Sequence, residues 1–290
     1  MPGTLYLVAT PIGNLDDMPP RVAATFAAAD FVAAEDTRVT LRLLNHLGLK
    51  KPLVSYYEHA LHHGAAILAR IQAGEDCALC SDAGMPCISD PGAVLVRDAL
   101  DAGIRVVPVP GASACITALA VSGQDTARFV FEGFLPRPKK ERRARLEALR
   151  REERTILLYE APHRLRATLE DLSGALGAER SVTLCRELTK LHEEIVKTTL
   201  GAAAEHYRQA EPRGEYVLVV AGAQPGGADA APLTRQDVVA AARQLLADGA
   251  SPAAAAKQAA AGTPFARGEI YKELLADRAG PDADRPDGGE

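Results

Sequence analysis

The sequence predicts an α/β protein of two domains with a small helical extension at its C-terminal end. Short β-branched or apolar runs alternate with helical patterns over most of the 290 residues, which is the order expected of βαβ units and a largely parallel sheet. Turn residues follow three of the predicted strands, at residues 11–14, 82–86 and 108–111. A chain of this length suits two compact domains, or two with an appendage.

The individual elements follow from these alternating patterns. Predicted strands cover residues 4–10, 31–35, 77–81, 106–109, 129–132, 155–159, 181–186, 194–199 and 216–221. Predicted helices between them include residues 22–29, 37–47, 64–73, 94–102 and 165–176. Three more helical patterns, at residues 235–247, 252–260 and 267–276, have no strands between them and predict a small three-helix unit, with helix-turn-helix as one candidate form.

Two breaks in the pattern predict domain boundaries. One lies near residues 122–128, and the other is QPGGA at residues 224–228, whose composition is typical of a flexible linker. The predicted parts are an N-terminal α/β domain (1–124), a second α/β domain (125–224), the linker with the three-helix extension (225–276) and an acidic tail (277–290). The tail is rich in Asp, Gly and Pro, so we expect it to be disordered.

Composition excludes several classes of protein. The chain is 47% hydrophobic and 24% charged, as globular proteins are, and no run of about 18 apolar residues is present to span a membrane. The opening MPGTLYLVATPIGN lacks the basic and apolar regions of a signal peptide, and five scattered cysteines indicate a reduced, cytoplasmic protein. A net charge of −5 and a pI near 5.9 argue against a surface that binds nucleic acid all over.

Patterns typical of metals and common nucleotides are weak or missing. Cys77 and Cys80 form a C-x-x-C pair, but on a strand they would point to opposite faces, and no second pair exists. His59 and His63 share a helical spacing near His62, yet no carboxylate motif completes a site, so an exposed polar face is expected. Neither G-x-G-x-x-G after the first strand nor a P-loop occurs, so we expect no metal and neither of those nucleotide sites.

Seven motifs follow one another between about residues 5 and 221. They are VATPIGNL (8–15), AEDTR (34–38), SDAGMP with SDPG (81–92), PVPGASA (108–114), EGFLP (132–136), YEAPHRL (159–165) and RELTK (186–190). In this order they resemble the tetrapyrrole-methylase superfamily, and within it the ribosomal-RNA ribose methyltransferases. Three departures stand out: Met85 replaces a usual Thr, Ala112 replaces a common Pro, and Tyr57 and Ala60 alter the usual S-Y-H-E-H-N.

The resemblance implies a two-domain tetrapyrrole-methylase-like fold, S-adenosylmethionine as cofactor and a homodimer. It also implies that the methyl acceptor is the ribose 2′-hydroxyl of a cytidine in 16S ribosomal RNA of the small subunit. The strand-end loops at 82–86 and 110–114 would bring backbone close to the ligand, with Asp82 or Asp90 near its cation or ribose. The predicted cofactor residues are Pro11, Gly13, Asp82, Gly84, Met85, Pro86, Asp90, Ser113, Ala114, Tyr159, Glu160, Glu215 and Tyr216.

Two polar clusters after predicted strands are the candidate catalytic groups. Glu35 and Arg38 belong to the first, in which Asp36 has the alternative role of capping a helix. Glu187 and Lys190 belong to the second. A ribose hydroxyl is a weak acid, so Glu35, Glu187 or Lys190 is predicted to act as base or to orient the hydroxyl. The arginines of both clusters, Arg38 and Arg186, are predicted to contact phosphates.

A run of cations follows the EGFLP motif in an otherwise acidic chain. Its members with a predicted role in RNA binding are Arg137, Lys139, Lys140, Arg142 and Arg143. Such a run is often only the solvated face of a helix, but beside a ligand-binding edge it also suits a polyanionic substrate.

Two other functions remain open from the sequence. One is a tetrapyrrole carbon methyltransferase, which would keep the fold and change the acceptor. The other is a non-catalytic relative that binds RNA or a nucleotide, to which the altered Tyr57 and Ala60 positions give weight. The basic run and the helical extension favour RNA, because a macrocycle needs neither.

Overall fold

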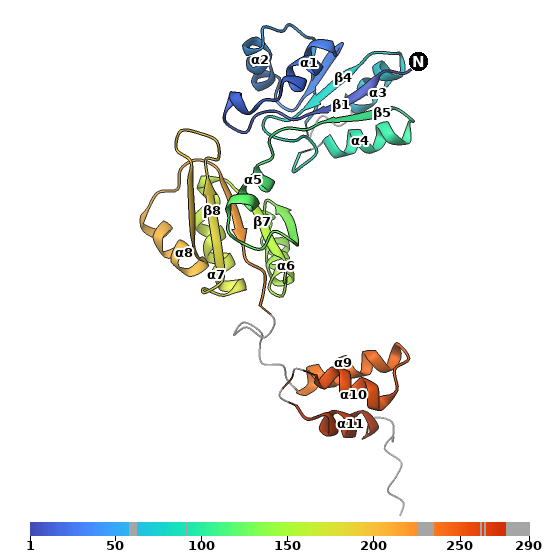
Figure 1. Cartoon of the computed structure of the whole chain (residues 1–290), viewed down its shortest axis with the longest axis vertical. Helices are drawn as coiled ribbons and strands as arrows, with labels where there is room; N and C mark the ends of the chain where they lie inside the picture. Colours follow the sequence, from blue (N-terminus) through green and yellow to red (C-terminus); the bar gives the residue numbers. More distant parts are fainter. Residues whose placement is uncertain (58–62, 91, 225–234, 262, 264, 277–290) are drawn as a thin grey trace, which may run out of the picture. The chain divides into compact units, whose positions relative to one another are not determined.

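The computed structural model describes residues 1–57, 63–90, 92–224, 235–261, 263 and 265–276 (Figure 1). The chain divides into two compact units, Met1–Gln224 and Pro225–Glu290. His59, Ala60, His62, the predicted linker and the predicted acidic tail lie outside the described residues. The predicted boundary between residues 124 and 125, inside the first unit, stays a prediction.

The first sheet is parallel throughout and has the strand order β3-β2-β4-β1-β5. Its strands are β1 (Thr4–Val8), β2 (Phe31–Ala34), β3 (Leu53–Ser55), β4 (Cys77–Cys80) and β5 (Arg105–Val109). The four residues of β2 and of β4 are all buried, as expected of parallel strands covered on both faces. This sheet has the parallel topology that the alternating pattern predicts.

Helices cover both faces of the first sheet (Figure 1). On one face α1 (Pro20–Ala28) and α2 (Thr37–His46) form a core with Cys80, and on the other α3 (His63–Gln72) and α4 (Gly92–Asp101) form a core with Cys77. The two cysteines therefore point to opposite faces, as predicted. A short 3-10 helix, η1 (Leu15–Asp17), follows the loop after β1.

The second sheet is mostly antiparallel, which corrects the expectation of a largely parallel arrangement. Its strands are β6 (Phe129–Gly133), β7 (Thr155–Glu160), β8 (Ser181–Arg186), β9 (Glu194–Thr199) and β10 (Tyr216–Val220), in the order β6-β7-β10-β8-β9. Only β6 and β7 pair in parallel, and the helix α6 (Lys139–Leu149) connects them in the chain. The strand β10 enters between β7 and β8 and runs against both, and β9 follows β8 after a short loop.

Helices also cover both faces of the second sheet. The helices α6, α7 (Pro162–Leu176) and α8 (Leu200–Gln209) bury leucines against one face. The helix α5 (Ala114–Val121), which follows β5 in the chain, packs its Cys115 and Leu119 on the other face, beside Val217 of β10. The start of α5 therefore links the loop after β5 to the second sheet.

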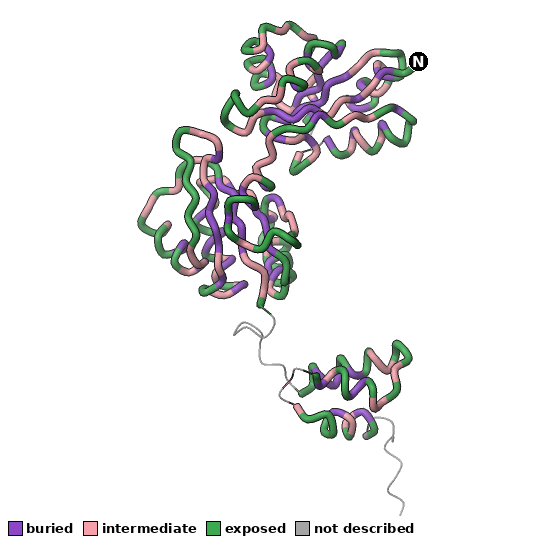
Figure 2. Tube along the Cα trace, in the orientation of Figure 1, coloured by how far each residue is buried: buried purple, intermediate pink, exposed green. Residues whose placement is uncertain are grey.

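The second unit contains three described helices, α9 (Arg235–Ala247), α10 (Pro252–Ala260) and α11 (Arg267–Ala276). Their buried side chains form a separate small core that includes Val239, Ala256 and Ile270. Figure 2 shows buried stretches along these helices. The predicted fold class is thus confirmed: two α/β sheets and a helical extension. Within the described ranges, no helix is both long enough and apolar enough to cross a membrane.

Candidate active site

A pocket of about 240 Å³, open to solvent on one side, lies in the first unit where the loops of the parallel sheet meet the second sheet. The loops after β1, β4 and β5 form one wall. The carboxyl ends of β7 and β8 and the beginning of β10 form the other. The pocket therefore lies at the carboxyl ends of parallel strands, where open α/β sheets bind ligands.

Many of the predicted cofactor residues line this pocket. Those that line it are Gly84, Met85, Ser113, Ala114, Tyr159, Glu160, Glu215 and Tyr216. Those that do not are Pro11, Gly13, Asp82, Pro86 and Asp90. The lining residues that sequence reasoning missed are Ile12, Ala83, Ile88, Phe134, Ala161, Cys185, Leu188 and Val217. Most of these lie inside or next to a motif, which is the signal that could have found them.

Backbone hydrogen bonds join the loops after β1 and β4. The N–H of Thr10 donates to the carbonyl of Gly84 (2.9 Å), and the N–H of Gly84 donates back to Thr10 (3.0 Å). Gly84 has φ +80°, a conformation that side chains other than glycine adopt at a cost. A Cβ there would also lie 3.3 Å from Cγ2 of Ile12, which lines the same pocket. Glycine at this position therefore allows the backbone of the loop after β4 and the side chain of Ile12 to lie as they do in the pocket wall.

Asp90 folds its own loop. Its Oδ1 accepts hydrogen bonds from the N–H of Cys87 (2.8 Å) and of Gly92 (2.9 Å). The loop between them contains two left-handed residues, Cys87 (φ 73°) and Ser89 (φ 67°). These hydrogen bonds offset the cost of that backbone conformation, so the Asp90 carboxylate has a structural role.

Two aromatic side chains, Phe134 and Tyr159, contact each other in the pocket lining. The hydroxyl of Tyr159 accepts a hydrogen bond from the N–H of Cys115 (3.1 Å), at the beginning of α5. The rings of Phe131 and Phe134 meet Tyr159 edge to face, with centroid distances of 5.0 and 5.8 Å. Burial raises the pKa of Tyr159, so this phenol stays protonated at neutral pH.

Glu187, Lys190 and Glu215, here called the lysine cluster, lie together in the pocket wall. The Lys190 Nζ donates to Oε1 of Glu187 (2.8 Å) and to Oε2 of Glu215 (2.8 Å). The N–H of Glu215 also donates to the Glu187 carboxylate (2.9 Å). Glu187 itself has φ +50° and Thr189 φ +66°, so the loop that presents the cluster has a strained backbone, a feature that gathers at functional sites.

Two glycines leave room for the lysine cluster. A Cβ on Gly13 would lie 2.4 Å from Cγ of Lys190, and a Cβ on Gly214 would lie 2.4 Å from Cγ of Glu187. Gly214 also has φ +76°. Gly13, predicted as a cofactor residue, therefore adjoins the aliphatic part of Lys190 at the edge of the pocket.

The charges of the lysine cluster stabilise one another. Burial alone would lower the pKa of Lys190, but its hydrogen bonds to Glu187 and Glu215 outweigh burial and raise it. Burial alone would raise the pKa of Glu187, but hydrogen bonds from Lys190 and from the Glu215 N–H outweigh it and lower it. At neutral pH the lysine is therefore a cation and Glu187 an anion.

Glu35, Asp36, Arg38 and Asp82, here called the Glu35 cluster, lie outside the pocket lining. Asp36 caps α2 by accepting a hydrogen bond from the N–H of Arg38 (2.8 Å), which is the structural role predicted as its alternative. Asp36 also binds the guanidinium of Arg38, a side chain that is 86% exposed. Hydrogen bonds from Arg38 lower the pKa of Asp36 to about 2. The N–H of Asp82 donates to Glu35 (3.4 Å), so the cluster holds the beginning of the loop after β4.

The carboxylates of the Glu35 cluster differ in their surroundings. The pKa of Glu35 is raised, mainly by burial. The hydrogen bond from the N–H of Asp82 lowers this pKa, but the negative charges of Asp82 and Asp90 raise it further. Burial likewise raises the pKa of Asp82, whose Oδ1 accepts from the N–H of Asp36 (3.0 Å).

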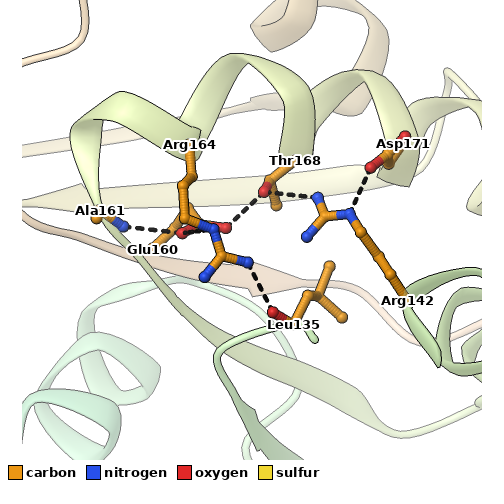
Figure 3. Close-up of polar contacts among 7 residues, drawn as sticks. All are labelled: Leu135, Arg142, Glu160, Ala161, Arg164, Thr168 and Asp171. Atoms are coloured by element: carbon orange, nitrogen blue, oxygen red, sulfur yellow. Dashed lines mark hydrogen bonds and ion pairs between the residues drawn. The ribbon is translucent and has the colours of Figure 1, made fainter. Parts of the chain in front are cut away.

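A buried polar network surrounds the side chain of Glu160, the last residue of β7 (Figure 3). The Glu160 side chain is 0% exposed and accepts from the N–H of Ala161 (2.9 Å) and from the hydroxyl of Thr168. Arg164 forms an ion pair with it (3.4 Å) and donates to a carbonyl, that of Leu135 (2.6 Å). These partners satisfy a buried carboxylate that would otherwise be costly.

Arg142 of α6 completes this network from the other end. Its guanidinium donates to Oδ2 of Asp171 (2.6 Å) and to the Thr168 hydroxyl (2.9 Å), and only 14% of the side chain is exposed (Figure 3). Arg142 thus joins α6 to α7. Arg186, predicted to contact phosphates, forms an ion pair with Glu194 (3.1 Å).

A second hollow, here called the basic groove, lies between α6 and α7. Four of the five predicted RNA-binding residues line it: Arg137, Lys139, Arg142 and Arg143. His163 and Arg164 of α7 line it as well, and Lys140 does not. Apart from Arg142, the predicted RNA-binding residues are exposed, so the groove presents cations to solvent.

The cysteines and the other possible metal ligands of the described residues bear on the chemistry of the pocket. In the ranges described above, no three His, Cys, Asp or Glu side chains gather as a metal site would require. All five cysteines are free, and burial raises the pKa of the Cys185 thiol, which lines the pocket, to about 11. That thiol is therefore protonated and a poor nucleophile at neutral pH.

Comparison with known proteins places the motifs and the pocket in a family. A family model described as Tetrapyrrole (Corrin/Porphyrin) Methylases matches residues 4–204. The chain is 48% identical over 279 residues to "Ribosomal RNA small subunit methyltransferase I" of Synechocystis sp., covering 95% of this chain and 99% of that protein. It is 42% identical over 275 residues to the protein of the same name from Bacillus subtilis, covering 93% of both chains.

Solved structures share the fold at low sequence identity. Uroporphyrin-III C-methyl transferase from Thermus thermophilus, complexed with S-adenyl homocysteine, superposes with a TM-score of 0.54 at 18% identity, over 76% of this chain and 97% of that one. This likeness concerns the fold, whereas the relatives above match in sequence over nearly the whole chain. The chain therefore belongs to the tetrapyrrole methylases and, among them, to the family of ribosomal RNA small subunit methyltransferase I.

Proposed function

We propose that this chain transfers the methyl group of S-adenosylmethionine to the 2′-hydroxyl of a cytidine ribose in 16S ribosomal RNA. The observation that carries the proposal is the 48% identity to a small subunit ribosomal RNA methyltransferase over 95% of this chain and 99% of that relative. The structure supports it because six of the seven motifs contribute residues to one pocket, the exception being AEDTR.

The residues of the pocket fit this cofactor. Ile12, Leu188 and Val217 offer apolar surface for an adenine ring, and the left-handed Gly84 lets backbone approach a ligand closely. Glu215 supplies a carboxylate for a cationic part of the molecule. When bound, S-adenosylmethionine supplies a methyl carbon that its sulfonium already activates. The chain must then hold the acceptor oxygen about 3 Å from that carbon and in line with the breaking bond.

The lysine cluster suits the acceptor hydroxyl. Because Lys190 is protonated, its ammonium can hydrogen-bond to the ribose oxygen and orient it, but it cannot take up the proton. Glu187 is ionised and can accept a hydrogen bond from the hydroxyl as the proton leaves. We therefore assign proton acceptance to Glu187 and orientation to Lys190.

The catalytic roles predicted for Glu35 and Arg38 stay predictions. Their hydrogen bonds, through Asp36 and Asp82, support a part in shaping the loop after β4 rather than at the reacting atoms.

The basic groove is the proposed contact for the RNA backbone. Arg137, Lys139 and Arg143 are exposed in it, and Lys140 is exposed on the same helix. Concentrated cations on an acidic chain suit a polyanion, whose binding releases counterions. Arg142 is already bound to Asp171 and Thr168, which supports a role in holding the groove together.

We also propose a homodimer and a cytoplasmic location. The edge strand β9 exposes Ile195 and Val196, and Leu191 just before it is exposed too, so this sheet edge has apolar surface for a second copy. A ribosomal substrate requires the cytoplasm, where free thiols remain reduced.

A choice among acceptors tests the proposed function. Purified full-length chain is incubated with methyl-labelled S-adenosylmethionine and, separately, ribosomal RNA, small subunits or uroporphyrinogen. We expect label in RNA, free or in the subunit. Label only in uroporphyrinogen would make the chain a tetrapyrrole carbon methyltransferase, and binding of RNA without transfer would make it a non-catalytic relative.

A further inference from the structure

Phe134 is an aromatic side chain that lines the pocket and yet remains half exposed. It follows the last residue of β6, and the residue is 49% exposed. Ile88 is the other large apolar side chain among the pocket's lining residues that is classed as exposed. A single exposed Phe on a surface needs no explanation, but one in a pocket wall offers an unoccupied face to whatever enters.

The Phe134 ring is held firmly from behind. Gly133 has φ +61°, and a Cβ there would lie 2.8 Å from Oγ of Ser89, so the end of β6 is close against the loop after β4. The ring meets Tyr159 edge to face, and the Tyr159 hydroxyl is fixed in turn by the N–H of Cys115. A ring fixed in this way loses little conformational entropy when a planar ligand stacks on it.

The chain leads directly from this ring to cations. Pro136, two residues later, already lines the basic groove, and Arg137 and Lys139 follow in it. A stacking platform next to phosphate-binding cations is the combination with which proteins hold single-stranded nucleic acid. The other aromatic residues that line the pocket are less exposed, because Tyr159 is only partly exposed and Tyr216 is buried.

We propose that Phe134 stacks on the unpaired base of the target nucleotide, with the adjoining phosphates in the basic groove. Enzymes that modify one nucleotide take it out of its helix and hold its base on aromatic side chains. Stacking on Phe134 keeps the base at the pocket wall, while the ribose of the same nucleotide faces the lysine cluster in that pocket. This inference rests on the proposed function and adds the residue that selects an unpaired base.

A single tryptophan tests the stacking directly, because the chain contains no tryptophan. Phe134→Trp places one reporter at the ring, and Phe129→Trp places one on the exposed Phe at the other end of β6, outside the pocket lining. We expect ribosomal RNA to quench the fluorescence of Phe134→Trp and to leave Phe129→Trp unchanged after the same absorbance correction. Quenching by S-adenosylmethionine alone would overturn the proposal, because the ring would then stack on the cofactor's adenine. Equal quenching of the two variants by RNA would overturn it as well.

Kinetics give a second readout that a purely structural role would not move. With saturating S-adenosylmethionine, Phe134→Ala should lower kcat/KM for RNA by about tenfold or more, mainly through KM, and Phe134→Tyr should recover it to within about threefold. The dissociation constant for S-adenosylmethionine, measured by calorimetry, should stay within about twofold. Wild-type kinetics for Phe134→Ala, or loss of its cofactor binding, would contradict the proposal. A wild-type chain that methylates no RNA would instead refute the proposed function, and the fluorescence arm would still report on stacking.

Discussion

The lysine cluster and the Glu35 cluster look alike in sequence and differ in the structure. In each, a glutamate directly follows a strand and a basic residue follows three positions later: Glu187 and Lys190 after β8, and Glu35 and Arg38 after β2. In the structure Glu187, Lys190 and Glu215 line the pocket, whereas Glu35 and Arg38 do not. Catalytic residues were predicted in both clusters. The difference shows that charged residues after a strand do not by themselves identify a catalytic site.

The partners of the two cations explain the difference. Arg38 binds Asp36, two residues away, in a helix cap, and remains almost fully exposed. Lys190 binds Glu215, 25 residues away at the beginning of another strand, and the glycine before that residue has the conformation that admits Glu187. A cation bound to a carboxylate of a distant segment therefore marks the site better than a cation bound to its neighbour, because local helix capping accounts for the contacts of Arg38 and not for those of Lys190.

The largest expected effect is on Lys190. Lys190→Ala removes the cation that orients the acceptor and pairs Glu187 with Glu215, so kcat for RNA methylation should fall about 100-fold, or about 3 kcal/mol of barrier. Cofactor affinity should change much less. Lys197→Ala is the matched control, because its ammonium binds only the carbonyl of Gly123 at an exposed position. Near-normal turnover in Lys190→Ala would remove the lysine cluster from catalysis.

A pair of glycines sharpens the comparison at the loop after β4, which contains Asp82 of the Glu35 cluster and contributes Gly84 to the pocket. Gly84 and Gly48 both have left-handed backbone (φ +80° and +70°), so alanine should cost each about 1–2 kcal/mol of stability. A Cβ at Gly48 meets no atom within 4 Å, whereas one at Gly84 presses on Ile12. Calorimetry should show at least about tenfold weaker S-adenosylmethionine binding for Gly84→Ala alone. Similar affinities in the two variants would place the ligand elsewhere.

The basic groove extends the comparison from catalysis to RNA capture. Replacing Lys139, Lys140 and Arg143 with Ala should flatten the slope of log affinity against log salt by about two to three units, since each phosphate contact releases counterions. A triple variant of Arg21, Arg42 and Lys50 removes three exposed cations from the region of α1 and α2 and is the control. Equal slopes in both triple variants would make the cations of α6 an ordinary solvated face.

The smallest effect should be that of Glu35. Because burial raises its pKa above the unfolded value of 4.5, the ionised carboxylate destabilises the folded chain above that pH. Glu35→Gln should therefore raise Tm by about 1–2 °C at pH 7, with the gain vanishing as the pH falls below 4.5. Turnover should drop less than tenfold. The exposed Glu141→Gln serves as control, and a loss of turnover as large as that of Lys190→Ala would make the two clusters equivalent.

Sequence reasoning was strongest where chemistry is local. Gly84, Ser113 and Tyr159 were found because glycines, prolines and polar residues at strand ends signal loops that bind ligands, and the structure brings these loops into one pocket. The helix cap at Asp36 was foreseen for the same reason. The three-residue strand β3 was missed because so short a run has no visible period.

What the sequence could not supply depends on contacts between distant segments. Nothing local indicates that β10 would insert between β7 and β8 and make the second sheet mostly antiparallel. The hydrogen bonds of Asp90 to its own loop depend on left-handed backbone at Cys87 and Ser89. Cysteine and serine seldom adopt that conformation, so the sequence does not indicate it. Arg142 was different, because it shares a helical face with the buried Leu146 and could have been set apart from the exposed cations around it.

The chemical position of the transferred methyl group tests the central claim most directly. One portion of the small-subunit RNA labelled by the wild-type chain would be digested to nucleosides, and the labelled nucleoside identified by mass spectrometry. A second, intact portion would be hydrolysed with alkali, because cleavage of the phosphodiester bond next to the labelled nucleotide requires a free 2′-hydroxyl. We expect a single labelled product, 2′-O-methylcytidine, at least about 100-fold reduced with Lys190→Ala. Label on a base carbon or nitrogen, or undiminished label with Lys190→Ala, would contradict it.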